Sequence, residues 1–261
     1  MSVHRHVFLL ALACGTLTTS GLTSTSTSTL TLTSTRAMAA DDIVSRSIAM
    51  YASLKSYADT GVVISQFAAG SSYRHTFTTY YRAPRNYYFE FAADKASGAA
   101  RLVMWCDGGD FQSWSSALGE HNVYPRGSNT VLSGFAAQAS PTSRANTLIA
   151  GLLFAGGGLV STLNEFADYT VEGVEEVGGH RCHKLVGVAR SMYRQTQRVT
   201  NVRRAIVWID ADSLLIRKVF EDTPQGSPSS AVNRTTVTIE PQANPTLEDA
   251  RFRFAVPSTQ P

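Results

Sequence analysis

The chain has 261 residues with 23 Lys and Arg against 20 Asp and Glu, a formal net charge of +3. Arg5 and Arg36 precede residue 41, so residues 41–261 carry 21 basic against 20 acidic residues and a net charge of +1. No run of Lys and Arg interleaved with aromatic residues stands out, which argues against a nucleic-acid partner. This stretch is long enough for one large domain with a buried core, and no linker divides it.

Residues 1–40 have the features of an export leader. An apolar run at 7–13 is followed by a Ser/Thr-rich tract, and the small residues at 37–40 form a site that a signal peptidase cuts before Asp41. Seven residues are too few to span a bilayer, which needs about 20. Alternatively, the residues around Cys14 loosely resemble a lipobox, in which the Cys is lipidated and anchors the protein to an envelope membrane. Both interpretations predict an exported, periplasmic protein.

Hydrophobic periodicity predicts one helix followed by strands. Residues 42–55 carry apolar residues at spacings of three and four, and the acidic start suits the positive end of a helix dipole. From Tyr57 the period changes to two, with turn residues between the runs. The predicted strands are 57–67, 73–82, 86–91, 102–106, 110–115, 169–177, 180–190, 203–210, 214–221 and 233–241. The polar stretch 191–202 is predicted to be a loop.

A helical insert interrupts the strands at residues 141–166. Ser140 and Pro141 suit a helix start, and Gly156–Gly158 break the helix before a short second one at 159–166. No Lys-Ser or Lys-Thr follows these glycines, so a phosphate loop is not expected. The pattern predicts a mainly β (α+β) fold, a large curved antiparallel sheet covered on one face by helices.

Five short sequences in a fixed order carry a family resemblance. They are 81–90 (YRAPRNYYFE), 105–108 (WCDG), 179–185 (GHRCHKL), 207–218 (VWIDADSLLIRK) and 252–254 (FRF). In this order they resemble the LolA/LolB-like superfamily of periplasmic lipoprotein carriers and sorting proteins, in particular its uncharacterised exported branch. The resemblance covers nearly all of residues 41–261. It implies a half-barrel of about eleven antiparallel strands whose concave face is lidded by helices and holds acyl chains or another apolar ligand.

The resemblance and the residue pattern together predict a ligand site. Aromatic residues are densest at 80–91, and strand alternation sends them to both faces, so they either pack the core or line an apolar pocket. The predicted pocket and lid residues are Tyr81, Tyr87, Phe89, Phe91, Trp105, Leu148, Leu152 and Phe154. The resemblance also implies an Arg that holds the lid closed, for which Arg82 and Arg85 are the candidates.

The cysteine and histidine residues are the candidates for a disulfide and for a metal site. Cys106 and Cys182 form a disulfide in an oxidising compartment, or they are two inert thiols. A metal site made with His180 and His183 is not expected, since His180 and Cys182 share one face of a strand and His183 points to the other. No cofactor is expected.

Sequence motifs of catalysis do not occur in the chain. It has no Gly-x-Ser-x-Gly, and His75, His121, His180 and His183 lie in no catalytic signature. We therefore expect a non-enzymatic binding or carrier protein for a hydrophobic ligand or a lipoprotein acyl chain. The alternatives are a protein-interaction or envelope-stress sensing module of the same fold, with an envelope protein as partner, and an uncharacterised hydrolase with a close His and Ser or Asp pair in a cleft. No transmembrane segment is expected in residues 41–261.

Overall fold

The computed structural model describes residues 39–67, 70–93, 100–126, 142, 144–154, 162–193, 198–224 and 232–257. The predicted leader lies outside these residues up to residue 38, including Cys14 and the first half of the small-residue run at 37–40. So do the predicted helix start at 140–141 and the glycines at 156–158. Among the described residues no helix is both long enough and apolar enough to cross a membrane.

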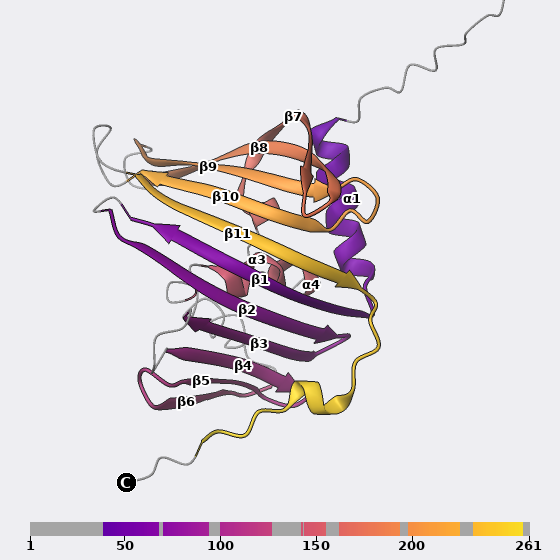
Figure 1. Ribbon diagram of the computed structural model, residues 1–261, viewed down its shortest axis with the longest axis vertical. Coiled ribbons are helices and arrows are strands. Elements are labelled where there is room, and N and C mark those ends of the chain that lie inside the picture. Colours follow the sequence, from indigo (N-terminus) through magenta and orange to yellow (C-terminus); the bar gives the residue numbers. More distant parts are fainter. Residues whose placement is uncertain are drawn as a thin grey trace, which may run out of the picture. The chain divides into compact units, whose positions relative to one another are not determined.

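Eleven described strands form one antiparallel sheet (Figure 1). They are β1 (Ser56–Gln66), β2 (Ser72–Arg82), β3 (Asn86–Ala93), β4 (Arg101–Asp107), β5 (Phe111–Ser115), β6 (Glu120–Tyr124), β7 (Ala167–Val177), β8 (His180–Tyr193), β9 (Arg198–Asp210), β10 (Ile216–Pro224) and β11 (Val232–Ala243). The order in the sheet is β6-β5-β4-β3-β2-β1-β11-β10-β9-β8-β7. Since β6 and β7 stand at opposite ends of this order, the sheet is open, and the predicted mainly β half-barrel is confirmed.

Most predicted elements agree with the structure. The N-terminal helix is α1 (Ala40–Ser53), and all ten predicted strands are present. The sequence missed β6, a short strand of mostly exposed residues at the edge of the sheet that has no apolar alternation. The prediction of a loop over all of residues 191–202 is wrong. The hairpin strands β8 and β9 extend to Tyr193 and from Arg198, because backbone pairing continues through polar positions.

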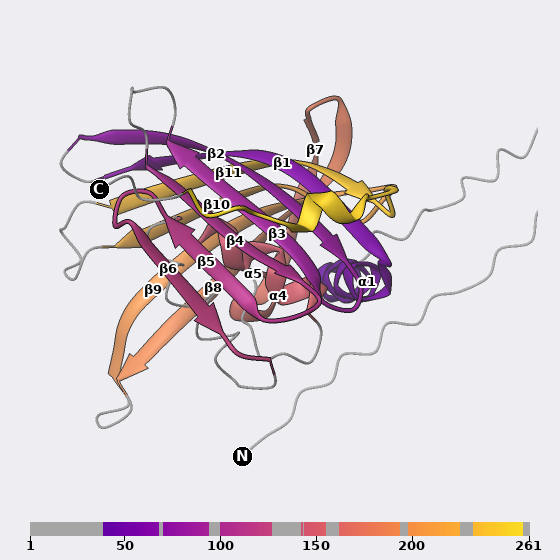
Figure 2. The same ribbon diagram turned by 90° about the horizontal axis from the view of Figure 1, so that it is seen from below.

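Helices cover one face of the sheet, which we call the inner face (Figure 2). The insert forms three pieces of four residues each, α3 (Ala145–Leu148), α4 (Ala150–Leu153) and α5 (Thr162–Glu165). We call these three pieces the lid. Helix α1 lies on the same face and buries Ile43, Ser47 and Tyr51. Figure 2 shows the sheet curving around these helices.

Strand register places two rows of side chains on the inner face. One row runs from Tyr57 through Tyr81 and Tyr87 to Cys106. The next row, one pleat along, contains Asp59, Thr79, Phe89, Met104 and Ser113. All these residues are buried. In the following row Gly61 is required, because a Cβ at this position would overlap the ring of Phe77.

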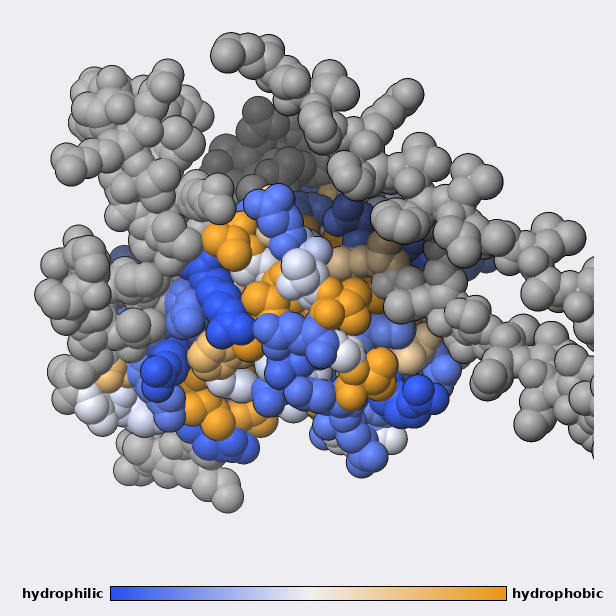
Figure 3. Space-filling view, turned by 90° about the horizontal axis from the view of Figure 1, so that it is seen from above, coloured by the Kyte–Doolittle hydropathy of each residue, from blue (hydrophilic) through white to orange (hydrophobic). Residues whose placement is uncertain are grey.

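The opposite face of the sheet, the outer face, is partly covered by the C-terminal segment. The short helix η1 (Asp249–Phe252) lies against β3 and β4. Edge strand β7 exposes Val171 and Val174. Seen from above, the apolar residues form separate patches divided by hydrophilic ones (Figure 3).

Candidate functional site

Apolar side chains of the lid contact those of the inner face. The ring of Phe154, which follows α4, lies 5.3 Å from the ring of Tyr81 and 5.6 Å from that of Tyr87, centroid to centroid. Leu148 and Leu152 of the lid are buried in the same core. Seven of the eight predicted pocket and lid residues meet here: Tyr81, Tyr87, Phe89, Phe91, Leu148, Leu152 and Phe154.

Trp105, the eighth, does not belong to this group. It pairs with Tyr88 and Gln112 on the outer face, where its ring stacks on His121 and contacts Phe254, with centroids 5.6 Å and 5.1 Å away. Residues 102–106 are all apolar. Their sequence therefore shows no alternation from which the face of Trp105 could be read.

Arg82 does not hold the lid either, contrary to the expectation from the resemblance. Its guanidinium donates to Asp249 Oδ1 at 2.6 Å and to the carbonyl oxygen of Leu247 at 3.2 Å, and it lies 5.0 Å from the ring centre of Phe252. These contacts fix the C-terminal segment. Arg85, the second candidate, lies close enough to the Cys106 thiol to affect its pKa, although burial dominates and raises that pKa.

Four other charged residues join the lid to the sheet. Arg144 immediately precedes α3, Glu165 ends α5, and Arg203 and Glu221 stand on β9 and β10. Glu165 pairs with both arginines, and Glu221 Oε2 lies 3.6 Å from Arg144 Nη1 and 3.8 Å from Arg203 Nη1. We call these four residues the lid ion-pair cluster.

The cluster is shielded from solvent. Its side chains are 13 to 34% exposed, so the attraction within it is screened less than at an open surface. Arg144 has a left-handed backbone with φ of 66°, which residues other than glycine seldom adopt. No motif marks these residues, which are far apart in the sequence, so sequence reasoning missed them.

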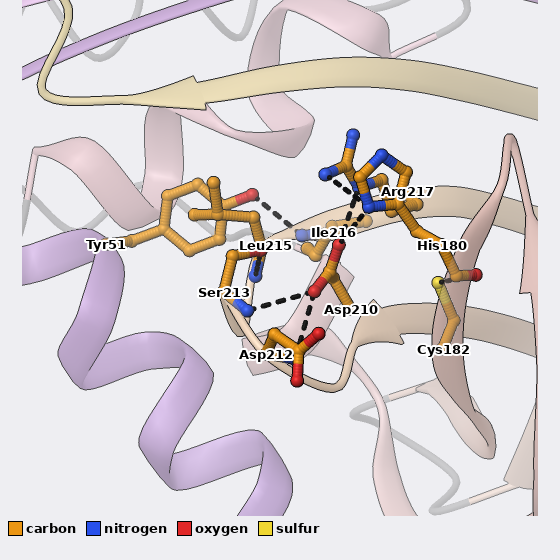
Figure 4. A network of polar contacts seen from close by, with 9 residues as sticks. All are labelled: Tyr51, His180, Cys182, Asp210, Asp212, Ser213, Leu215, Ile216 and Arg217. Atoms are coloured by element: carbon orange, nitrogen blue, oxygen red, sulfur yellow. Dashed lines mark hydrogen bonds and ion pairs between the residues drawn. The ribbon is translucent and has the colours of Figure 1, made fainter.

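A second polar network lies beside the turn between β9 and β10 (Figure 4). Asp210 Oδ1 accepts hydrogen bonds from the backbone N–H groups of Asp212 and Ser213, and Oδ2 accepts one from Arg217 Nε at 3.0 Å. Burial alone would raise the pKa of Asp210, but these hydrogen bonds and the Arg217 charge hold that pKa below its usual value. Asp210 Oδ2 also lies 3.2 Å from His180 Nδ1.

His180 and Arg217 of this network line a surface depression of about 410 Å³, and the close His180 and Asp210 pair is the arrangement that a hydrolase would use. His180 Nδ1 also faces Arg217 Nη2 at 3.2 Å, so that nitrogen accepts a hydrogen bond from the guanidinium. Cys182 is fully buried, and burial raises its pKa to about 11, which keeps it a thiol. Ser213 contacts Asp210 through its backbone N–H, and its hydroxyl accepts a hydrogen bond from the Leu215 N–H. Among the described residues the network thus lacks an activated nucleophile. Its contacts stabilise the turn.

Of the two interpretations left open for Cys106 and Cys182, the structure agrees with two thiols, since both are buried and free and no disulfide joins them. Six strands separate β4 from β8, which makes seven steps of about 4.8 Å or about 34 Å along the sheet, whereas a disulfide needs Cα atoms within about 7 Å. The two side chains also point to opposite faces. Sequence spacing alone carries no information on this separation.

No group of three or more His, Cys, Asp and Glu side chains in the described part of the chain is arranged to hold a metal ion. The register places His183 opposite Ile209 on the inner face and Cys182 opposite Asp210 on the outer face. These neighbouring side chains therefore diverge.

The fold and this site define a class of protein, an open antiparallel half-barrel with a helical lid over an apolar face. No family model matches the chain, and no curated protein matches it.

Solved structures similar to the chain include a protein of the superfamily that the sequence resembles. A LolA superfamily protein from Nitrosomonas europaea has 10% identity and a TM-score of 0.35, with 84% of this chain and 99% of that chain covered. The lipoprotein LppX of Mycobacterium tuberculosis has 15% identity and a TM-score of 0.42, with 80% and 98% covered. MucB in complex with MucA has 13% identity and a TM-score of 0.42, with 83% and 60% covered.

Proposed function

We propose that the protein is a non-enzymatic, exported carrier that holds a lipid, a lipoprotein acyl chain or another apolar ligand between its inner face and its lid. The observation that carries this proposal is the construction of the lid. Three helices of four residues each lie over the sheet and share one core with the buried aromatic side chains of β2 and β3, of which Phe154 contacts Tyr81 and Tyr87. Isolated helices shorter than about 12 residues are marginal in water, so the lid depends on its packing against the sheet.

An apolar ligand can replace that packing. Acyl chains laid on the same aromatic surface bury it as well as the lid leucines do, at roughly 25 cal/mol per Å² of apolar area. Exchange of lid for ligand then costs little hydrophobic free energy. The lid ion-pair cluster adds a polar contact that closes the lid over its cargo.

Native mass spectrometry tests the proposal. The full chain is purified from its own envelope without detergent, its intact mass is measured, and the sample is extracted with organic solvent. A bound mass that extracts as lipid supports the carrier. A folded protein with a clean unliganded mass contradicts it and favours the protein-interaction module.

A pair of variants tests where the ligand lies. Leu152→Asp places a charge beneath the lid, at a residue that is 2% exposed, and we expect it to lose the bound lipid. Leu118→Asp makes the same change at a residue that is 68% exposed and serves as the control. Equal lipid retention by two folded variants would place the ligand elsewhere.

A further inference from the structure

Asp59 places a carboxyl group among the aromatic side chains of the inner face. It stands on β1 and is 3% exposed. Its Oδ2 accepts a hydrogen bond from the Tyr57 hydroxyl at 2.8 Å, and Thr79 on the neighbouring strand also donates to the carboxyl group. Its Oδ1 is buried and has no partner among the described residues.

No cation of the described residues compensates this carboxyl group. The neighbours that act on its pKa are Tyr57 and Thr79, both uncharged, and burial is the largest effect and raises the pKa to about 6. At neutral pH the carboxyl group is therefore mostly ionised, with hydrogen-bond donors but no cation from the described part of the chain beside it. A buried charge without a partner is costly, and a packing role alone does not require one.

The lid covers the row to which Asp59 belongs. Met104 lies in the same row, and Asn146 of α3 contacts its sulfur at 3.8 Å. At the far end of that row Ser113 is 1% exposed, and its Oγ is buried without a partner among the described residues. This row thus carries Phe89 and Met104 between two polar positions, the Asp59 carboxyl group with Thr79 beside it and the Ser113 hydroxyl.

We propose that Asp59 is the polar anchor of the ligand site and receives the primary ammonium group of an amphiphile whose chains lie under the lid. This inference rests on the proposed carrier function and specifies its ligand class. An ammonium group supplies both the missing hydrogen bond to Oδ1 and the missing positive charge. An alcohol supplies only the hydrogen bond, and a carboxylate is repelled.

Competition between two matched amphiphiles tests the assignment. The full-length protein is loaded at pH 7.5 with the neutral dye N-phenyl-1-naphthylamine, which is then displaced by dodecylamine or by dodecanoate below their micelle concentrations. We expect dodecylamine to displace the dye at least tenfold more effectively. Equal displacement by the two would overturn the assignment.

Three variants link the preference to Asp59. Asp59→Asn and Asp59→Ser both remove the charge, and Ser is the second choice in case the amide disturbs folding. Within each folded variant the two amphiphiles should displace the dye equally well, so that the preference for the amine is lost. Glu240→Gln removes an exposed carboxyl group on the outer face of β11 and should keep it.

The outcomes separate the two proposals. The role of Asp59 is rejected if the unmodified chain binds the dye without preferring the amine, or if both Asp59 variants keep that preference. Neither result contradicts the carrier function. Failure of the folded, unmodified chain to bind the dye rejects both.

Discussion

Replacing Asp59 by Asn should make the protein more stable at neutral pH. Burial raises the pKa of Asp59 from 3.8 to about 6, and each unit corresponds to about 1.36 kcal/mol. The native state therefore bears a penalty of about 3 kcal/mol for holding this carboxylate above pH 6. Asn has the same shape and no charge. The resulting increase in the free energy of unfolding is smaller by about 1 kcal/mol if the Asn amide N–H has no acceptor.

The pH dependence has a definite sign. Below about pH 4 both the native and the unfolded chain hold the proton on Asp59, and the penalty is absent. Between pH 4 and 6 the native state binds more protons than the unfolded state, so this group lowers stability as the pH rises. The advantage of the Asn variant should thus be largest above pH 6 and nearly vanish at pH 4.

Urea denaturation at pH 7.5 and pH 4.5 measures this difference. Other carboxyl groups, such as Glu90 and Asp249, have lowered pKa values and weaken every variant as the pH falls, so only the gap between variant and unmodified protein is informative. Glu240→Gln, which removes an exposed carboxyl group, is measured alongside as the control. A gap for Asp59→Asn that is equal at the two pH values would refute the reasoning.

Three further predictions concern the lid, the thiols and the C-terminal segment. Glu165→Gln leaves two arginines without their shared partner, so amide hydrogen exchange at 145–153 should accelerate about tenfold. This corresponds to a fall of about 1.4 kcal/mol in the free energy of local opening. Unchanged exchange would mean that packing alone closes the lid. Cys106 and Cys182 should react with a thiol reagent on denaturation without prior reduction, and a need for reductant would contradict the free thiols. Arg82→Ala should cost about 1 kcal/mol and speed exchange in η1 while dye binding stays the same; weaker dye binding would return Arg82 to the lid.

The sequence predicted the sheet well because strand periodicity is a local property. Alternation in β1, β2 and β3 identified the strands and most of the aromatic residues of the inner face. It failed at Trp105, where residues 102–106 of the strand are all apolar, and at the polar edge strand β6. Both failures have the same cause, since alternation is informative only where one face is wet and the other dry.

The contacts that close the lid could not be predicted. Arg144 and Glu165 meet Arg203 and Glu221 only because the insert folds back across strands that come later in the chain. The carboxyl group of Asp59 was equally hidden, because a single acidic residue in a strand is ordinarily a solvent-facing one. Asp59 is buried because helices cover this face of the sheet, which the sequence around Asp59 does not reveal.

The pairing of β1 with β11 has a consequence for the order of synthesis. All other neighbours in the sheet are also neighbours along the chain, whereas this pair joins Tyr57 to Ala243. Until β11 leaves the ribosome, β1 has an open edge and the two halves of the sheet remain unjoined. For a protein exported as proposed above, this delay keeps the chain from completing its fold before it is threaded through the membrane.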